Sequence, residues 1–87
     1  MPQRIVREVR GIPLWLLREY LEEDGGRASE DGHSVVGDGW TVRLTQLEDF
    51  QVGSLCVGQL RVELEGDGEP FERMQALLEK KLLRAGG

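Results

Sequence analysis

Residues 37–47 decide the fold and read GDGWTVRLTQL. From Trp40 onward apolar and polar side chains alternate, so one face of a strand carries Trp40, Val42 and the apolar residues that follow. The Asp38-Gly39 pair lies between this run and an earlier apolar run, and such a pair is a strong local signal for a β-hairpin. The stretch therefore predicts an antiparallel sheet with one buried face.

Further strands are predicted on both sides of this stretch. Residues 3–10 hold apolar side chains among charges and favour a first strand, and residues 33–36 form a brief strand before the hairpin turn. Residues 48–50 are predicted as a turn that leads into a long strand, 51–65. The apolar positions of this long strand change phase halfway, so we expect a bulge or bend near Gly58.

Two amphipathic helices are predicted, one before and one after the later strands. Residues 14–24 place leucines and a tyrosine on one stripe, Pro13 suits the first helical position, and a Gly-Gly pair ends the helix. Residues 27–32 follow as a loop or a frayed edge strand, and a second helix begins at Pro70. The order of strand, helix, three or four antiparallel strands and helix predicts an α+β domain, with both helices packed on one face of the sheet.

Length and composition exclude several classes of protein. The chain has 87 residues, which is expected to form a single domain, and its 11 Lys and Arg against 16 Asp and Glu give a net charge of -5. This charge argues against nucleic acid and anionic membranes as partners. A single cysteine and a single histidine, with no signal-peptide core and no membrane-spanning run, predict a cytoplasmic protein without a metal or other cofactor. The lack of asparagine fits a thermophilic source.

The residues that could perform catalysis are few. Cys56 and His33 are the only nucleophile and base that could pair for covalent catalysis. Cys56 falls in the middle of a strand, where a lone cysteine is most simply a small core residue. His33 opens a strand beside a polar loop and is most simply a solvated edge residue. An enzyme is therefore the least expected class, and no catalytic residue is assigned.

Acidic residues also form a ladder on one strand. Glu63 and Glu65 point the same way and Asp67 follows in a turn, which is an arrangement that could chelate a divalent cation. The spacing of a calcium-binding loop is absent, however. We favour a solvated face on which Arg61 pairs with Glu63 or with cross-strand neighbours.

Three features remain as candidates for binding. Trp15 falls off the apolar stripe of the first helix, so it either packs over the preceding strand or is exposed and marks a partner or ligand surface. Glu63 and Glu65 add an acidic patch to this candidate partner surface. Gly86 and Gly87 either end the second helix or form the flexible tail of a ubiquitin-like modifier or sulfur carrier. A small apolar ligand held between the sheet and the long helix is a further alternative.

Two parts of the chain carry a family resemblance. The segments concerned are Pro13, Trp15-Leu16-Leu17, Tyr20-Leu21-Glu22-Glu23, Gly25-Gly26, Val52-Gly53-Ser54-Leu55, Gln59-Leu60-Arg61-Val62-Glu63, Glu65-Gly66 and Phe71-Glu72-Arg73. Together they resemble the C-terminal domain of a MoaD-related protein of thermophilic bacteria, a domain of unknown function that follows a ubiquitin-like domain similar to the small subunit of molybdopterin synthase. The resemblance covers roughly residues 5–87.

The resemblance implies the same order of elements, in a helix-on-sheet arrangement similar to that of the TATA-binding protein. It also implies a setting near sulfur transfer or molybdenum-cofactor assembly. The ubiquitin-like half is not part of the resemblance, so its sulfur-carrier role is not implied for this chain. The leading hypothesis is a non-enzymatic accessory or interaction module that binds a protein partner or forms a homodimer.

Overall fold

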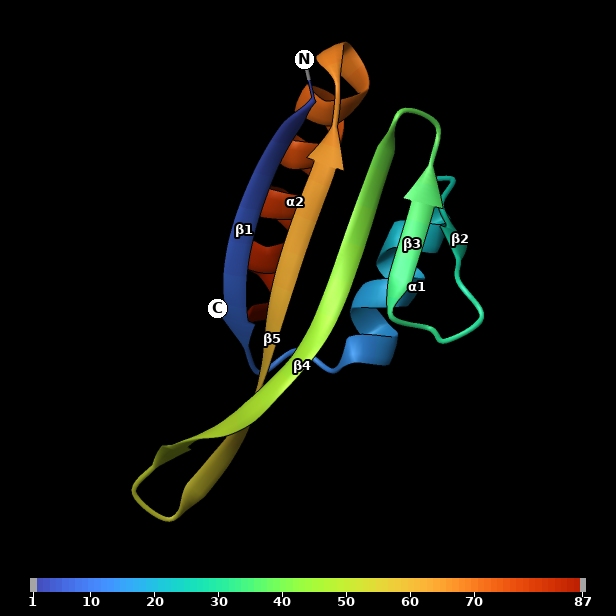
Figure 1. Ribbon diagram of the computed structural model, residues 1–87. Helices are drawn as coiled ribbons and strands as arrows, with labels where there is room; N and C mark the ends of the chain where they lie inside the picture. The colour runs from blue at the N-terminus through green and yellow to red at the C-terminus, as the bar shows by residue number, and fades with distance from the viewer. Residues whose placement is uncertain (1, 87) are drawn as a thin grey trace.

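A computed structural model describes the backbone of residues 2–86 and the side chains up to residue 81 (Figure 1). Its strands form one antiparallel sheet in the order β1-β5-β4-β3-β2. This confirms the predicted α+β class and the predicted order of elements. The elements are β1 (Gln3–Arg10), α1 (Leu14–Glu23), β2 (Arg27–Ala28), β3 (Ser34–Gly37), β4 (Trp40–Val52), β5 (Leu55–Gly66) and α2 (Gly68–Gly86).

Both helices cover the same face of the sheet (Figure 1). Helix α1 packs on β2 and β3, whereas α2 packs on β1, β4 and β5. Val42 of β4 lies directly opposite Leu64 of β5, so alternate residues of the two strands line the covered face. Burying these apolar side chains is the main source of stability. The buried apolar residues in the described part of the chain are Ile12, Leu17, Leu21, Val35, Trp40, Val42, Leu44, Leu60, Val62, Leu64, Phe71, Met74 and Leu78.

The ring of Trp40 lies over two glycines. A Cβ atom at Gly37 would lie 2.0 Å from Cε2 of Trp40, and a Cβ atom at Gly26 would lie 2.7 Å from Cη2 of the same ring. Real Cβ atoms essentially never approach another heavy atom so closely. Glycine at these two positions therefore lets the indole reach the backbone and enter the core.

The predicted turn at residues 48–50 is wrong, because β4 continues through these residues to Val52. Leu47 pairs with Gln59 and Phe50 pairs with Val57, so two residues of β4 lie opposite the single residue Gly58. This is a β-bulge, in which the strand absorbs an extra residue without ending. The bulge thus falls near Gly58 as expected, but its extra residue belongs to β4.

The hairpin turn that does reverse the chain is Gly53-Ser54. Val52 pairs with Leu55 across it, and Gly53 has φ +61°, whereas no non-glycine residue in the described part of the chain has a positive φ. A glycine with positive φ at the first position of a two-residue loop is the signature of a type II′ turn. The strand predicted from residue 51 therefore begins at Leu55 instead.

Lys81 of α2 joins the two helices. Its Nζ lies 3.8 Å from Oδ2 of Asp24 and 4.0 Å from Oε2 of Glu23, and it lies 4.9 Å from the centroid of the Tyr20 ring. Acidic side chains at the C-terminal end of a helix are unfavourable to its dipole. The ammonium group offsets this effect at the end of α1.

Candidate functional site

The outer parts of β4 and β5 form a two-stranded arm, residues 48–57, that projects beyond the rest of the sheet (Figure 1). Strand β1 ends opposite Gln59 and β3 ends opposite Arg43, so the arm residues pair only with one another. No residue of the arm is buried. The arm therefore adds nothing to the hydrophobic core, and its side chains are free to serve another purpose.

One face of the arm is apolar. Phe50 pairs with Val57 and Val52 pairs with Leu55, and paired residues of an antiparallel hairpin point to the same side. Val52 is 53% exposed and Leu55 is 67% exposed. Phe50, Val52, Leu55 and Val57 are called the apolar face of the arm. Exposed apolar side chains gathered on one face are typical of surfaces that contact another molecule.

Arg10, the last residue of β1, lies at the base of this apolar face. Its guanidinium carbon lies 3.6 Å from the centroid of the Phe50 ring, and its Nε donates a hydrogen bond to Oε1 of Gln59 at 3.1 Å. The cation–π contact holds the Phe50 ring in place at the root of the arm. On the other face of the arm, Nε2 of Gln51 lies 3.7 Å from Sγ of Cys56.

An open hollow of about 380 Å³ lies where the arm meets the loop between β1 and α1. The N–H of Gly11 donates to the carbonyl of Gly58 at 2.9 Å, which ties the loop to β5. Gly11 has φ +80°, a conformation that glycine adopts readily. The residues that line the hollow are Gly11, Ile12, Pro13, Gln46, Cys56, Val57 and Gly58.

The space between the sheet and α2 is occupied by side chains. Leu60 of β5 and Phe71 of α2 are both buried as members of the core, as is Trp40 of β4. This region was the predicted place for a small apolar ligand, and that alternative stays a prediction. The hollow at the base of the arm lies elsewhere.

The predicted partner residues lie on two different sides of the molecule. Trp15 stands in the first turn of α1, in the helix layer, and is 54% exposed. Of its two predicted environments, the structure thus shows the exposed one. Glu63 and Glu65 alternate along β5 with the core residues Val62 and Leu64, so they point to the face without helices. The structure does not bring Trp15 and the two glutamates together.

The helix-free face carries ion pairs between strands. Arg4 contacts the carboxylate of Glu63, and its Nε lies 3.6 Å from Oε1 of Glu65. Arg61 lies 3.6 Å from Glu8, so of its two predicted partners, Glu63 or a cross-strand neighbour, the structure shows the second. Exposed pairs of this kind contribute about 0–1 kcal/mol each. Within the described residues, no group of three His, Cys, Asp or Glu side chains is placed to hold a metal ion.

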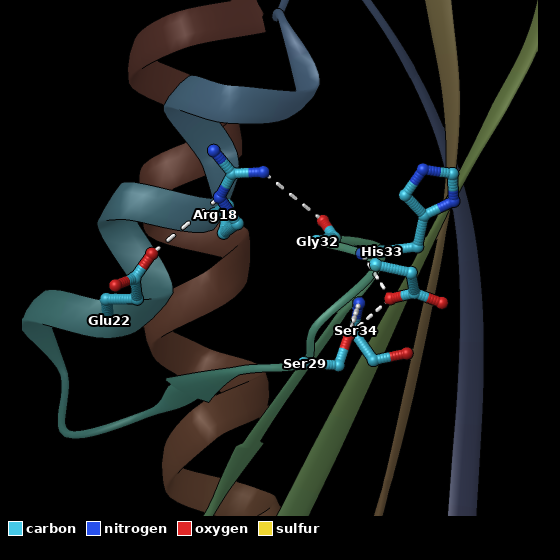
Figure 2. Close-up of polar contacts among 7 residues, drawn as sticks. Arg18, Glu22, Ser29, Gly32, His33 and Ser34 are labelled. Carbon is cyan, nitrogen blue, oxygen red and sulfur yellow. Dashed lines mark hydrogen bonds and ion pairs between the residues drawn. The ribbon is translucent and has the colours of Figure 1, made fainter.

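His33 and Cys56 belong to different regions. His33 lies in the loop between β2 and β3, whereas Cys56 lies in the arm. Asp31 in this loop accepts a hydrogen bond from the hydroxyl of Ser29 and another, at 2.9 Å, from the backbone N–H of His33. Figure 2 shows the imidazole of His33 pointing away from Ser29. Ser29, Asp31 and His33 therefore stabilise a turn and do not form a catalytic triad, which requires a bond between imidazole and hydroxyl.

The same loop makes a pH-dependent prediction. The hydroxyl of Ser29, followed by the backbone N–H of His33, holds the pKa of Asp31 below the ordinary value of 3.8. Because the folded-state pKa is lowered, the stabilisation by Asp31 is complete above the ordinary value and is lost as the pH falls through the lowered one. We expect Ser29→Ala to raise the pKa of Asp31, whereas Ser29→Thr keeps it low. Carbon-13 NMR titration of the Asp31 carboxyl checks this, and equal midpoints in both variants would contradict it.

The glycine tail lies at the limit of the described residues. Helix α2 ends at Gly86, and Gly87 lies outside the part of the chain that the structure describes. The prediction of a functional Gly86-Gly87 tail stays a prediction.

The arm is the part of the site that reasoning from sequence missed. Its signal was present in the two-residue Gly53-Ser54 loop between apolar runs, which is a hairpin pattern. The acidic pair Glu48-Asp49 favours a turn just as strongly, and it lies at the position where the sequence predicts the turn. A long hairpin with a bulge and a short hairpin with a wide turn cannot be separated on local sequence alone.

Fold and site together define a small α+β domain with a projecting β-hairpin arm. The chain matches the family described as archaeal MoaD-like protein over residues 5–87, and it belongs to that family. The resemblance to a MoaD-related domain is thereby confirmed. No curated protein matches the chain. In the described residues, no helix is both long and apolar enough to span a bilayer.

Proposed function

We propose that this MoaD-like protein is a non-enzymatic interaction module that binds a protein partner through the apolar face of its arm. The single observation that carries the proposal is the exposure of Val52 and Leu55 on a ribbon that takes no part in the core. A two-stranded ribbon is only marginally stable in water without further packing. A partner that covers these side chains would supply this packing.

The chemistry of the arm indicates what kind of partner fits. Residues 48–57 hold two acidic side chains, Glu48 and Asp49, and neither lysine nor arginine. Both are at the base of the arm, while the tip is apolar. The partner surface that complements the arm is an apolar groove for the tip, with basic residues at the end of the groove that contacts the base of the arm.

Membership of the MoaD-like family supports a partner from sulfur transfer or molybdenum-cofactor assembly. The arm offers binding rather than chemistry, since its one thiol, Cys56, is hydrogen-bonded only to Gln51 in the described residues. We therefore propose an accessory role, in which the protein holds or orients a component of such a system.

Val52→Glu is the sharpest test of this proposal. Val52 is 53% exposed on the arm and Val36 is 51% exposed on β3, so Val36→Glu is a control of the same residue type, the same exposure and the same change in charge. We expect Val52→Glu to weaken partner binding by at least about tenfold, because it places a charge in an apolar contact. Affinity isolation from the native host, followed by mass spectrometry, measures the loss.

The two variants should fold alike, which circular dichroism verifies. A protein retained by wild type and Val36→Glu but lost by Val52→Glu supports the proposal. If the same proteins are recovered in equal amounts with both variants, the arm is not the docking surface.

A further inference from the structure

Strand β1 is a long edge strand of the sheet. It pairs with β5 along all eight residues, Gln3–Arg10, and in the described residues no strand pairs with its outer side. The opposite edge is β2, which has only two residues. Natural sheets keep edge strands short or cover them, because free backbone groups recruit another strand. The two edges of this sheet therefore differ in their capacity to pair.

The phase of the hydrogen bonds shows which residues of β1 face outward. The N–H of Gly11 donates to the carbonyl of Gly58, and this pair continues the register of β1 with β5. In an antiparallel ladder, hydrogen-bonded and non-hydrogen-bonded pairs alternate. Odd-numbered residues of β1 therefore bond to β5, and the even-numbered residues Arg4, Val6, Glu8 and Arg10 direct their N–H and C=O groups to the outer edge. The carbonyl of Val6 accepts a hydrogen bond there from Nη1 of Arg7 at 3.1 Å, a side-chain contact that takes the place of a strand partner in the single chain.

We propose that β1 pairs antiparallel with β1 of a second copy of this chain, about a two-fold axis at Val6. In this register Val6 lies opposite its own copy, and Arg4 of each chain lies opposite Glu8 of the other. Val6 is 43% exposed in the single chain, so the apolar contact at the centre uses a side chain that has no place in the core. The dimer joins two sheets into one continuous sheet.

Charge complementarity selects this register. Within one chain Arg4 is paired with Glu65, and Glu8 is paired with Arg61. Across the contact between the two β1 strands, the charges of neighbouring side chains would then alternate. The row runs from Glu65 to Arg4 of one chain and continues with Glu8 and Arg61 of the second copy. Moving the two-fold axis from Val6 to Arg7 would place Arg4 opposite Arg10, and like charges directly opposite each other are destabilising. Moving it to Ile5 would place Arg4 opposite Val6 and would lose both opposite-charge pairs.

The dimer leaves both arms free. Strand β1 runs toward the base of the arm, because Arg10 pairs with Gln59. Antiparallel pairing of two β1 strands therefore places the two arms at opposite ends of the joined sheet. Dimerisation through β1 and the binding of a partner by the arm use separate surfaces. An experiment can therefore contradict one of the two proposals without contradicting the other.

Mixing two charge-reversal variants tests the register. Glu8→Arg alone places arginine opposite arginine, and Arg4→Glu alone places glutamate opposite glutamate, so we expect each to be at least about tenfold weaker in dimerisation than wild type. An equimolar mixture restores both opposite-charge pairs and should form a heterodimer. Each substitution also changes ion pairs inside its own chain, but that change is the same before and after mixing, so a heterodimer reports only the contact between the two chains. Light scattering after size exclusion measures the masses.

A cross-link gives a second, independent measurement. Directly opposite residues in a hydrogen-bonded pair have Cα atoms about 5.5 Å apart, which is within the range that a disulfide spans. We expect Val6→Cys in a Cys56→Ser background to form a disulfide dimer under mild oxidation. Val36→Cys in the same background is the control and should form no disulfide-linked dimer, although its β1 strands still pair without a covalent bond. A monomeric wild type at millimolar concentration, a mixture without heterodimer, or equal cross-linking at both positions would overturn the proposal.

Discussion

Trp40→Ala is expected to lower the free energy of unfolding by about 3–5 kcal/mol, the range for removal of a buried large aromatic side chain. Trp40 is buried against Gly26 and Gly37, and its ring also approaches Val35 in the core. Because Gly26 and Gly37 have no side chains that could move into the cavity, we expect the loss of unfolding free energy to lie toward the upper end of this range. Small domains have only about 5–15 kcal/mol of stability in total, so this variant is close to unfolded.

Trp15→Ala provides the matched control, because Trp15 is the other tryptophan and is 54% exposed. Its removal should change the stability by no more than about 0.5 kcal/mol, as is usual at the surface. Urea unfolding measures both variants, and the Trp15→Ala protein retains only the buried indole, so its emission should be blue-shifted. Equal losses in the two variants would show that Trp40 does not anchor the core.

Gly37→Ala is expected to be the second most damaging change, with a loss of at least about 2 kcal/mol from overpacking. The added Cβ would lie 2.0 Å from Cε2 and 2.2 Å from Cζ2 of Trp40, which are atoms of a rigid ring. Either the hairpin between β3 and β4 opens or the indole leaves the core. Gly58→Ala is the control, since a Cβ at Gly58 meets no atom within 4 Å.

A double-mutant cycle identifies the cause of the Gly37→Ala effect. If the methyl group collides with the indole, Gly37→Ala should be nearly neutral once Trp40 is already alanine, because the two residues are coupled. Urea unfolding of the single and double variants gives the coupling energy. Additive losses would mean that Gly37 is required for a reason other than the ring.

Much of the fold could be predicted because the local patterns agree with one another. Residues 3–10 form a strand as predicted. The first helix begins at Leu14 as predicted, but Pro13 is its N-cap, with extended backbone, and not its first helical residue. The alternation from Trp40 to Leu44 correctly indicated the buried face of β4. In each case the side-chain period matches the element that buries it, so the local preference and the tertiary environment favour the same structure.

The arm could not be predicted with the same rules. Glu48-Asp49 and Gly53-Ser54 both look like turns, and only pairing with β5 decides between them. A strand pair persists across a bulge when the residues beyond it find partners, and those partners are far along the chain. Turn preference is local, whereas register depends on the whole ladder.

The sequence by itself determined the α+β class, the order of the elements and the acidic balance, because side-chain period and composition are properties of the chain alone. Only the tertiary structure decided that Trp15 and Glu63 lie on different sides of the molecule, and that β1 presents an open edge. Which residues share a surface depends on how strands are ordered in the sheet and which face the helices cover. The order of residues along the chain does not contain that information in any local form.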